Sequence, residues 1–251
     1  MEKGIFLSVV IPAYNEERRI GRTLEALDSY FKKQIFDYEI IVVSDGSKDK
    51  TADIVNEYAK KIKGLRIIAN EKNHGKGYVV RQGMREAEGK FRLFMDADNS
   101  VPVEYVDEFL PYFSKGYDVA IASIEVAGAK IEEHAAWYRR ALGHYSKLLI
   151  RALAIWEIRD TQRGFKMFSA RAAKDVFSLQ TIIGFGFDIE ILVIAKQLGY
   201  TIKELPVAWN NPGESKVGLS AYFATFKELF RIRKNMTGKA AARVFRRSGD
   251  I

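Results

Sequence analysis

Two aspartates, Asp96 and Asp98, directly follow a short apolar run at residues 91–95. Residues two positions apart in an extended chain point to the same side, so both carboxylates can converge on one cation. A divalent ion held by one or two carboxylates usually completes its coordination shell with substrate phosphates. Such a pair can also merely cap a helix, but its place at a strand end favours a metal site for a phosphorylated substrate.

Three further loops carry polar residues, glycine or proline where a plain connection would suffice: 12–16, 44–47 and 70–77. Asp45 either accepts a hydrogen bond from a nucleobase N–H or only bonds the backbone of its own turn. Segment 73–77 combines two glycines, Lys76 and the start of a helix, which suits a diphosphate. We interpret His74 in this segment as a structural or exposed loop residue.

The segments that must position these loops alternate between strands and helices. Apolar β-branched runs predict strands at 5–11, 38–43, 65–69, 91–95, 117–122 and 201–207, with a short one ending at Phe168. Helical spacing predicts helices at 17–30, around 54–62, at 75–87 and 102–113, from about 170, and from the 184–188 turn to Leu198.

This alternation predicts an α/β fold with a doubly wound, mostly parallel sheet and helices on both faces. Ligands bind such sheets beyond the carboxyl ends of the strands, where the four polar loops belong. We expect the first strand to end before Pro12, because proline cannot donate to a strand ladder.

The composition narrows the class of protein. The 251 residues suffice for one large domain or a domain with an appendage, and we expect the domain at 1–218 and a basic amphipathic tail at 219–251. The absence of cysteine excludes disulfides and thiolate metal sites and favours a reducing cytoplasm. The net charge of +8 favours an anionic partner, which is a nucleotide, a nucleic acid or a membrane surface. We expect neither a signal peptide nor a transmembrane helix.

Two basic segments, 134–156 and 219–247, combine apolar helix faces with many Lys and Arg residues. This pattern suits helices that lie in the interface of a membrane with anionic lipids. The same stripes could instead pack on the protein core or on a second subunit. The apolar stripe of the tail consists of Leu219, Tyr222, Phe223, Phe226, Leu229 and Phe230.

The motifs in the four polar loops, which form the rim at the carboxyl ends of the strands, have an order and spacing that resemble those of the inverting family-2 glycosyltransferases of the GT-A fold. The motifs that carry the resemblance are 10–16, 43–47, 75–77 and 96–98, and it covers roughly residues 5–218. Segments 160–166 and 186–190 are similar to the branch that glycosylates polyprenyl phosphates, which includes the dolichyl-phosphate β-glucosyltransferases and the dolichyl-phosphate mannose synthases. The Gln-x-x-Arg-Trp signature of processive members is missing, which favours transfer of a single sugar.

For the donor, the resemblance implies a nucleotide-sugar site. Pro12, Tyr14 and Glu16 would line the nucleoside pocket, and Asp45 would contact the base. Lys76 would lie near the base or the diphosphate. We favour UDP-glucose as the donor, with GDP-mannose as the alternative.

The resemblance also implies a divalent cofactor, Mg²⁺ or Mn²⁺, held by Asp96 and Asp98. Ser100 stands where the mannose synthases have a glutamine ligand, so it becomes the third candidate ligand and the metal's identity stays open. Ser215 and Lys216 would close over the phosphates from a mobile loop.

For the reaction itself, Asp98 and Asp160 are the candidate catalytic residues, with Asp160 beside the reacting sugar. A phosphate monoester has a second pKa of about 6, so an acceptor phosphate is already a nucleophile and needs no general base. We therefore expect Asp160 to position or shield the reacting groups. Arg139, Arg140 and, behind them, Arg163 are candidates for binding the acceptor phosphate.

Two other functions stay open at this point. One is a transferase of the same fold that uses a soluble acceptor, and the other is a non-catalytic nucleotide- or nucleic-acid-binding module. The carboxylates at the rim would repel a nucleic-acid backbone unless a metal were bound. The favoured interpretation is an enzyme that lies peripherally on the cytoplasmic face of a membrane.

Overall fold

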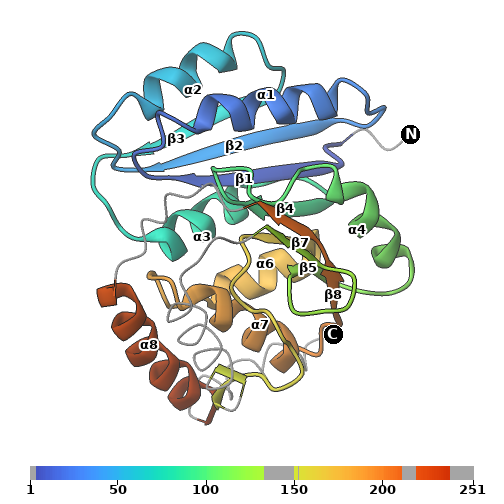
Figure 1. The fold of residues 1–251 in the computed structure, drawn as a ribbon, viewed down its shortest axis with the longest axis vertical. Coiled ribbons are helices and arrows are strands. Elements are labelled where there is room, and N and C mark those ends of the chain that lie inside the picture. Colours follow the sequence, from blue (N-terminus) through green and yellow to red (C-terminus); the bar gives the residue numbers. More distant parts are fainter. Residues whose placement is uncertain (1–3, 133–149, 152, 211–218, 238–251) are drawn as a thin grey trace.

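The centre of the molecule is a seven-stranded sheet with helices on both faces (Figure 1). The computed structural model describes residues 4–132, 150–151, 153–210 and 219–237. The strand order is β3-β2-β1-β4-β7-β5-β8. The strands are β1 (Leu7–Ala13), β2 (Tyr38–Asp45), β3 (Leu65–Asn70), β4 (Phe91–Met95), β5 (Val119–Ser123), β7 (Phe165–Ser169) and β8 (Ile202–Pro206).

Strand β7 is the exception to the parallel arrangement. It pairs antiparallel with both β4 and β5, while the other pairs in this sheet are parallel. A second, two-stranded parallel sheet joins β6 (Lys130–Glu132) to β9 (Ala208–Asn210). The predicted α/β fold with a mostly parallel sheet is confirmed, whereas the small second sheet was not predicted.

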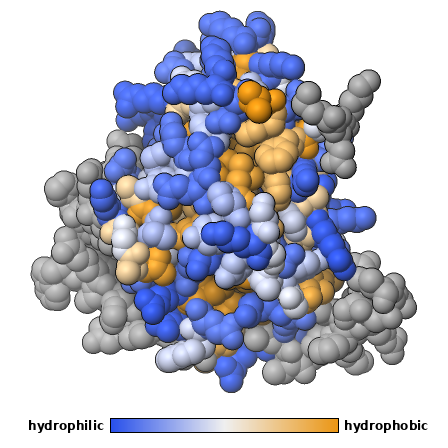
Figure 2. All heavy atoms as spheres, turned by 90° about the vertical axis from the view of Figure 1, so that its right-hand side faces the viewer, coloured by the Kyte–Doolittle hydropathy of each residue, from blue (hydrophilic) through white to orange (hydrophobic). Residues whose placement is uncertain are grey.

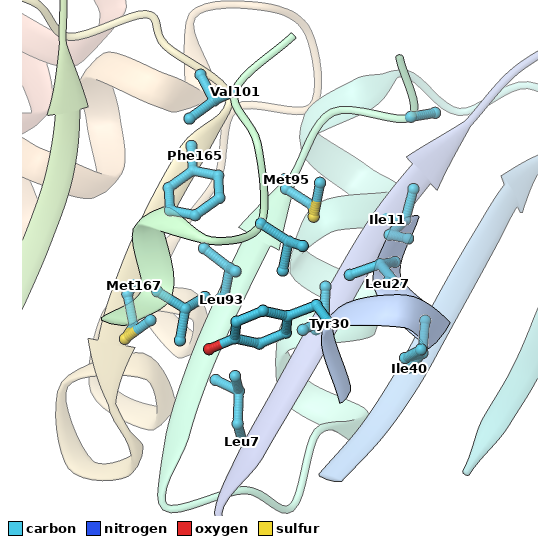
Figure 3. Close-up of a cluster of buried hydrophobic side chains, with 14 of the residues drawn as sticks. Leu7, Ile11, Leu27, Tyr30, Ile40, Leu93, Met95, Val101, Phe165 and Met167 are labelled. Carbon is cyan, nitrogen blue, oxygen red and sulfur yellow. The ribbon is translucent and has the colours of Figure 1, made fainter. Parts of the chain in front are cut away.

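The helices divide between the two faces because successive strand residues point to opposite sides. Val9 and Ile11 of β1 belong to one apolar cluster, and Val10 belongs to the other. The first cluster is covered by α1 (Ile20–Phe31), α2 (Thr51–Ala59) and α4 (Tyr105–Ser114). The second is covered by α3 (Lys76–Glu86), α6 (Ala170–Leu179), α7 (Phe187–Gln197) and α8 (Leu219–Thr237). Figure 3 shows part of the first cluster, where Leu27 and Tyr30 of α1 lie over the strands.

The predicted end of the first strand is wrong. Pro12 lies inside β1 and is in register with Val43 of β2. The pairing of β1 with β4 ends at Val10, so at Pro12 the strand has a neighbour on one side only. Proline is tolerated there as it is on an edge strand.

Helix α8 packs partly on the protein itself. Leu229 and Ile232 are buried in the same cluster as residues of α6 and α7, whereas Phe230 is 61% exposed. Leu229 of the apolar stripe thus packs on the protein core. Residues 133–149 and 238–251 of the two basic segments lie outside the described part of the chain. Within the described ranges, no helix has the length and apolar character needed to cross a bilayer.

Candidate active site

The end of β4 and the start of α3 meet at the carboxyl edge of the parallel strands. Asp96 directly follows β4, and Lys76 is the first residue of α3. The Lys76 Nζ atom lies 2.6 Å from Asp96 Oδ1. Burial alone would lower the pKa of Lys76. The negative charges of Asp96, Asp188 and Asp98 raise it by more than burial lowers it, so the net pKa is raised. Lys76 therefore carries a firm positive charge among carboxylates.

Because β7 is antiparallel, its first residues reach the same edge as the last residues of β4. The Asp96 N–H donates to the carbonyl oxygen of Gly164 at 2.9 Å. A Cβ atom at Gly164 would lie only 2.1 Å from Asp96 Oδ2, so this position has no room for a side chain. Glycine thus allows the segment before β7 to touch the Asp96 carboxylate.

Asp98 is held by the residues that follow it. Its Oδ1 accepts a hydrogen bond from the Ser100 N–H at 3.0 Å, and the Ser100 hydroxyl also bonds the carboxylate. Burial raises the pKa of Asp98, the charge of Asp96 raises it further, and Ser100 and Arg19 act in the opposite direction. Ionised Asp98 is therefore destabilised by its surroundings, and a nearby cation would relieve this.

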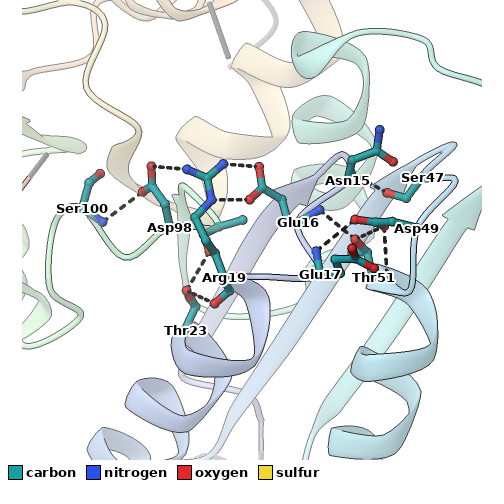
Figure 4. Close-up of polar contacts among 11 residues, drawn as sticks. Asn15, Glu16, Glu17, Arg19, Thr23, Ser47, Asp49, Thr51, Asp98 and Ser100 are labelled. Atoms are coloured by element: carbon teal, nitrogen blue, oxygen red, sulfur yellow. Dashed lines mark hydrogen bonds and ion pairs between the residues drawn. The ribbon is translucent and has the colours of Figure 1, made fainter. Parts of the chain in front are cut away.

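Helix α1 fixes this loop from the other side. The Thr23 hydroxyl donates to the Ala97 carbonyl oxygen at 2.7 Å. Arg19 forms two hydrogen bonds with Glu16, at 2.7 and 2.8 Å, and its Nη1 lies 3.9 Å from Asp98 Oδ2. In Figure 4 the guanidinium lies between the two carboxylates. Arg19 and Thr23 were missed in the sequence, although the Glu16–Arg19 spacing of three residues fits an ion pair.

The donor set of this loop fits a hard divalent cation. Asp96 and Asp98 supply carboxylate oxygens, which Mg²⁺ and Mn²⁺ prefer. The buried Asn99 Oδ1, between Asp98 and Ser100, has no hydrogen-bond partner in the described structure. Among the described residues, no group of three or more His, Asp or Glu side chains could hold a metal. A metal here would therefore need oxygens from Ser100, Asn99 or a substrate phosphate to complete its shell.

The backbone amides of the loop before α3 have partners other than the diphosphate for which this segment was suited. The His74 and Gly75 N–H groups donate to the two carboxylate oxygens of Asp45, at 2.7 and 2.9 Å. The Gly77 N–H donates to Ile183 O at 2.8 Å. These three amides are thus engaged within the protein, and the Lys76 side chain stays a candidate for binding the diphosphate.

The glycines of this loop allow another segment to come close. Gly75 has a φ of +101°, and a Cβ there would lie 2.5 Å from the Ile183 oxygen. The His74 ring stacks on Tyr78 with 4.5 Å between the ring centroids, in keeping with a structural role. Asp45 is buried and bonds this distant loop, so in the structure it joins two loops.

A hollow of about 400 Å³ opens beside the β1–α1 loop and is the candidate nucleoside pocket. It is lined by Asn15, Glu16, Glu17, Arg18, Arg19, Lys48 and Asp49. Of the three expected pocket residues, only Glu16 lines it. Tyr14 is 41% exposed, and Pro12 is buried in β1.

Asp160 is almost fully buried and holds several loops together. Its Oδ2 accepts hydrogen bonds from the Ile124 N–H at 3.2 Å and from Arg163 Nε at 3.1 Å. Its Oδ1 accepts one from the Gln162 N–H at 3.3 Å. The Arg163 guanidinium also lies 4.5 Å from the ring centroid of Trp209 in β9. This environment suits a positioning carboxylate better than a proton acceptor.

Four predicted site residues cannot be placed. Arg139, Arg140, Ser215 and Lys216 lie outside the described residues. The structure therefore brings together Lys76, Asp96, Asp98 and Ser100, with Glu16 joined to them through Arg19 and Asp160 through Arg163 and Gly164.

The family model described as glycosyl transferase family 2 matches residues 8–177, which include β1 to β7 and the rim just described. The chain belongs to glycosyl transferase family 2. As a member of this family it is an enzyme, and we set aside the alternative of a non-catalytic binding module.

Several curated relatives of this glycosyltransferase carry one name. A dolichyl-phosphate β-glucosyltransferase of Trichomonas vaginalis is 34% identical over 240 residues, which cover 91% of this chain and 73% of the relative. The human protein of that name is 34% identical over 251 residues, covering 92% of this chain and 76% of its own. The yeast (Saccharomyces cerevisiae) protein is 33% identical, covering 87% and 71%.

Solved structures show the shared GT-A fold of this glycosyltransferase. Glucosyl-3-phosphoglycerate synthase from Mycobacterium tuberculosis, in complex with Mn²⁺, UDP and glucosyl-3-phosphoglycerate, superposes with a TM-score of 0.69 at 20% sequence identity. The match covers 91% of this chain and 78% of that one. A second structure of that enzyme contains Mg²⁺ and UDP.

Proposed function

We propose that this glycosyltransferase moves one glucosyl group from UDP-glucose to the phosphate of a dolichyl or related polyprenyl phosphate, with inversion at the anomeric carbon. The observation that carries the proposal is the contact of Asp96 with both Lys76 and Gly164. This contact joins a cation suited to a diphosphate to the segment that contains Asp160. The names of the curated relatives support the choice of glucose and of dolichyl phosphate.

The donor would bind along the rim from β1 to β4. Glu16 lines the candidate nucleoside pocket. Pro12 and Asp45 lie at the carboxyl ends of β1 and β2, and Tyr14 directly follows β1. Lys76, whose Nζ lies beside Asp96, would contact the diphosphate. Asp96 and Asp98, with Ser100 as the third candidate, would hold Mg²⁺ or Mn²⁺. When bound, such an ion supplies electrostatic stabilisation of the negative charge that builds up on the departing nucleoside diphosphate.

The acceptor would approach from the side of Asp160. A phosphate dianion is already nucleophilic near neutral pH, so no residue has to remove a proton from it. Asp160 keeps Arg163 in place through the hydrogen bond at 3.1 Å. Arg163 would thereby present a fixed positive charge to the acceptor phosphate, together with Arg139 and Arg140. Ser215 and Lys216 would close over the donor phosphates.

A polyprenyl acceptor remains in a bilayer, so the enzyme would lie on a membrane surface, and the face that we propose is the cytoplasmic one. The exposed side of α8 supports this contact, because Phe230 is flanked there by the exposed Lys227 and Arg231. Basic and aromatic side chains on one helix side suit an anionic lipid surface. Figure 2 shows that the face seen there has several separate hydrophobic areas between hydrophilic ones, as most protein surfaces do.

The experiment is a transfer assay with radiolabelled donors. UDP-glucose, UDP-galactose and GDP-mannose are each offered with dolichyl phosphate in vesicles or with 3-phosphoglycerate, with Mn²⁺, with Mg²⁺ or with a chelator. We expect label in the lipid fraction from UDP-glucose only, and only with a metal present. Transfer from GDP-mannose, or to the soluble acceptor alone, would replace the proposal by one of the alternatives.

A further inference from the structure

Lys166 is a fully buried lysine in β7, with Phe165 and Met167 on either side of it in the strand. It is in register with Phe94 of β4 and Ile121 of β5. Burying an ammonium group is strongly unfavourable unless it is paired and hydrogen-bonded. An apolar side chain would fill this place without that penalty, so the charge itself calls for an explanation.

The ammonium of Lys166 is surrounded on three sides. Its Nζ lies 2.5 Å from Asp188 Oδ1 and 2.6 Å from the main-chain oxygen of Arg163. It also lies 5.2 Å from the ring centroid of Phe94. Lysine has three N–H donors, and these contacts fix the group in one position. Asp188, on the first turn of α7, is itself 3% exposed.

The carbonyl that Lys166 binds belongs to the peptide group between Arg163 and Gly164. On one side of this peptide, the Gly164 oxygen accepts the Asp96 N–H at 2.9 Å. On the other side, Arg163 Nε donates to Asp160 Oδ2 at 3.1 Å. The buried pair therefore holds the peptide that links the two carboxylates of the site.

We propose that Lys166, held by Asp188, is a positioning residue for glycosyl transfer. It fixes the Arg163–Gly164 peptide and thereby the placement of Asp160 relative to Asp96. This inference rests on the proposed function, in which Asp96 belongs to the donor site and Asp160 lies beside the reacting sugar. Asp96 has a second anchor, because Thr23 holds the next residue of its loop. Asp160 likewise has anchors outside this peptide, the Ile124 N–H and Glu204, so loss of Lys166 loosens the connection between the two carboxylates.

The decisive comparison uses a single and a double variant. Lys166→Met leaves Asp188 buried without its partner, and we expect the Tm to fall by about 10 °C. Lys166→Met with Asp188→Leu replaces both charges by apolar groups, which restores the Tm in many buried pairs. A misplacement of about 1 Å in an active site costs about 100-fold in rate. We therefore expect the kcat of the double variant to stay about 100-fold low although its Tm recovers.

If the kcat of the double variant recovers together with its Tm, the pair is only structural and the inference is overturned. Glu39→Met is the matched control, because Glu39 is also buried and accepts hydrogen bonds from Ser8 and Glu88, at the opposite end of β2 from the site. We expect this control to lower the Tm while its kcat stays within about twofold of the native value.

Hydrogen–deuterium exchange gives a second readout that needs no substrate. In the double variant we expect faster exchange in residues 160–165 than in the native protein, although the Tm has recovered. Unchanged protection of this segment overturns the inference. If the native protein fails to transfer glucose from UDP-glucose to dolichyl phosphate, the proposed function fails, and the exchange experiment still decides the role of Lys166.

Discussion

The Lys76 ammonium lies 2.6 Å from Oδ1 of Asp96, so a candidate phosphate-binding cation is paired with a candidate metal ligand. Each group compensates part of the other's charge at a partly buried rim. The arrangement holds Lys76 at the place where the proposed diphosphate and metal ion would meet. Removal of the lysine therefore affects the charge of the donor site directly.

We predict that Lys76→Met lowers kcat/KM for UDP-glucose about 100-fold, because a charge that stabilises the leaving diphosphate is lost. Steady-state transfer assays measure this. Lys72→Met, an exposed lysine of the same loop, is the control and should leave kcat/KM nearly unchanged. Equal losses in both variants would contradict a specific role for Lys76.

Asp98→Asn should stabilise the metal-free protein while abolishing metal-dependent transfer. Burial and the charge of Asp96 raise the pKa of Asp98 in the folded state above its usual 3.8. The folded state then binds the proton more tightly than the unfolded chain, so stability falls as the pH rises through this interval. Near pH 7 we expect the variant to melt about 3 °C higher, the shift for about 1 kcal/mol in a chain of this size.

This gain should vanish as the pH falls below 3.8, where Asp98 is protonated in both states. Thermal denaturation in chelator from pH 3 to pH 8 tests the prediction. A variant that is less stable than the native protein at pH 7 would show that Asp98 is well solvated or paired.

We predict that Asp160→Asn lowers kcat at least tenfold and leaves the affinity for UDP and Mn²⁺ unchanged, since the carboxylate positions Arg163 and lies away from the nucleoside pocket. Turnover and calorimetric titration with UDP separate the two effects. Asp37→Asn, an aspartate whose side chain is 73% exposed, serves as the control. Native turnover in Asp160→Asn refutes the assignment.

Phe230→Ser should weaken binding to vesicles that contain anionic lipid about tenfold, as expected for one aromatic side chain no longer buried. Vesicle sedimentation measures the change. Ile35→Ser, at a fully exposed isoleucine, is the control. Deletion of the whole tail is a poorer test, because it also removes Leu229 and Ile232 from the core.

Apart from β6 and β9, the sequence was sufficient for the order of the elements and for the loops at the strand ends, because apolar periodicity and the positions of strand ends are local properties. Lys76, Asp96, Asp98 and Ser100 accordingly lie together. The direction of β7 could not be predicted, since the short run before Phe168 contains nothing that distinguishes parallel from antiparallel pairing.

Contacts between distant residues were also beyond prediction. The partners of Asp45 lie 29 and 30 residues further along the chain, so its bonds to His74 and Gly75 leave no local pattern. Helical spacing revealed the stripe of α8 but not what covers Leu229. A lysine within the apolar run Phe165–Phe168 was a usable signal for Lys166, because an isolated charge in a buried strand must have a partner.

The hydrogen bond from the Ile124 N–H to Asp160 fastens the two ends of the 125–159 segment to each other. The antiparallel pairing of β5 with β7, the strands before and after this segment, also holds its two ends together. A segment whose two ends are held together can change in length or sequence at a small cost in loop-closure entropy, because its ends keep their positions. If Arg139 and Arg140 bind the acceptor as proposed, changes within this segment would alter the acceptor while the proposed donor residues of β1 to β4 keep their positions.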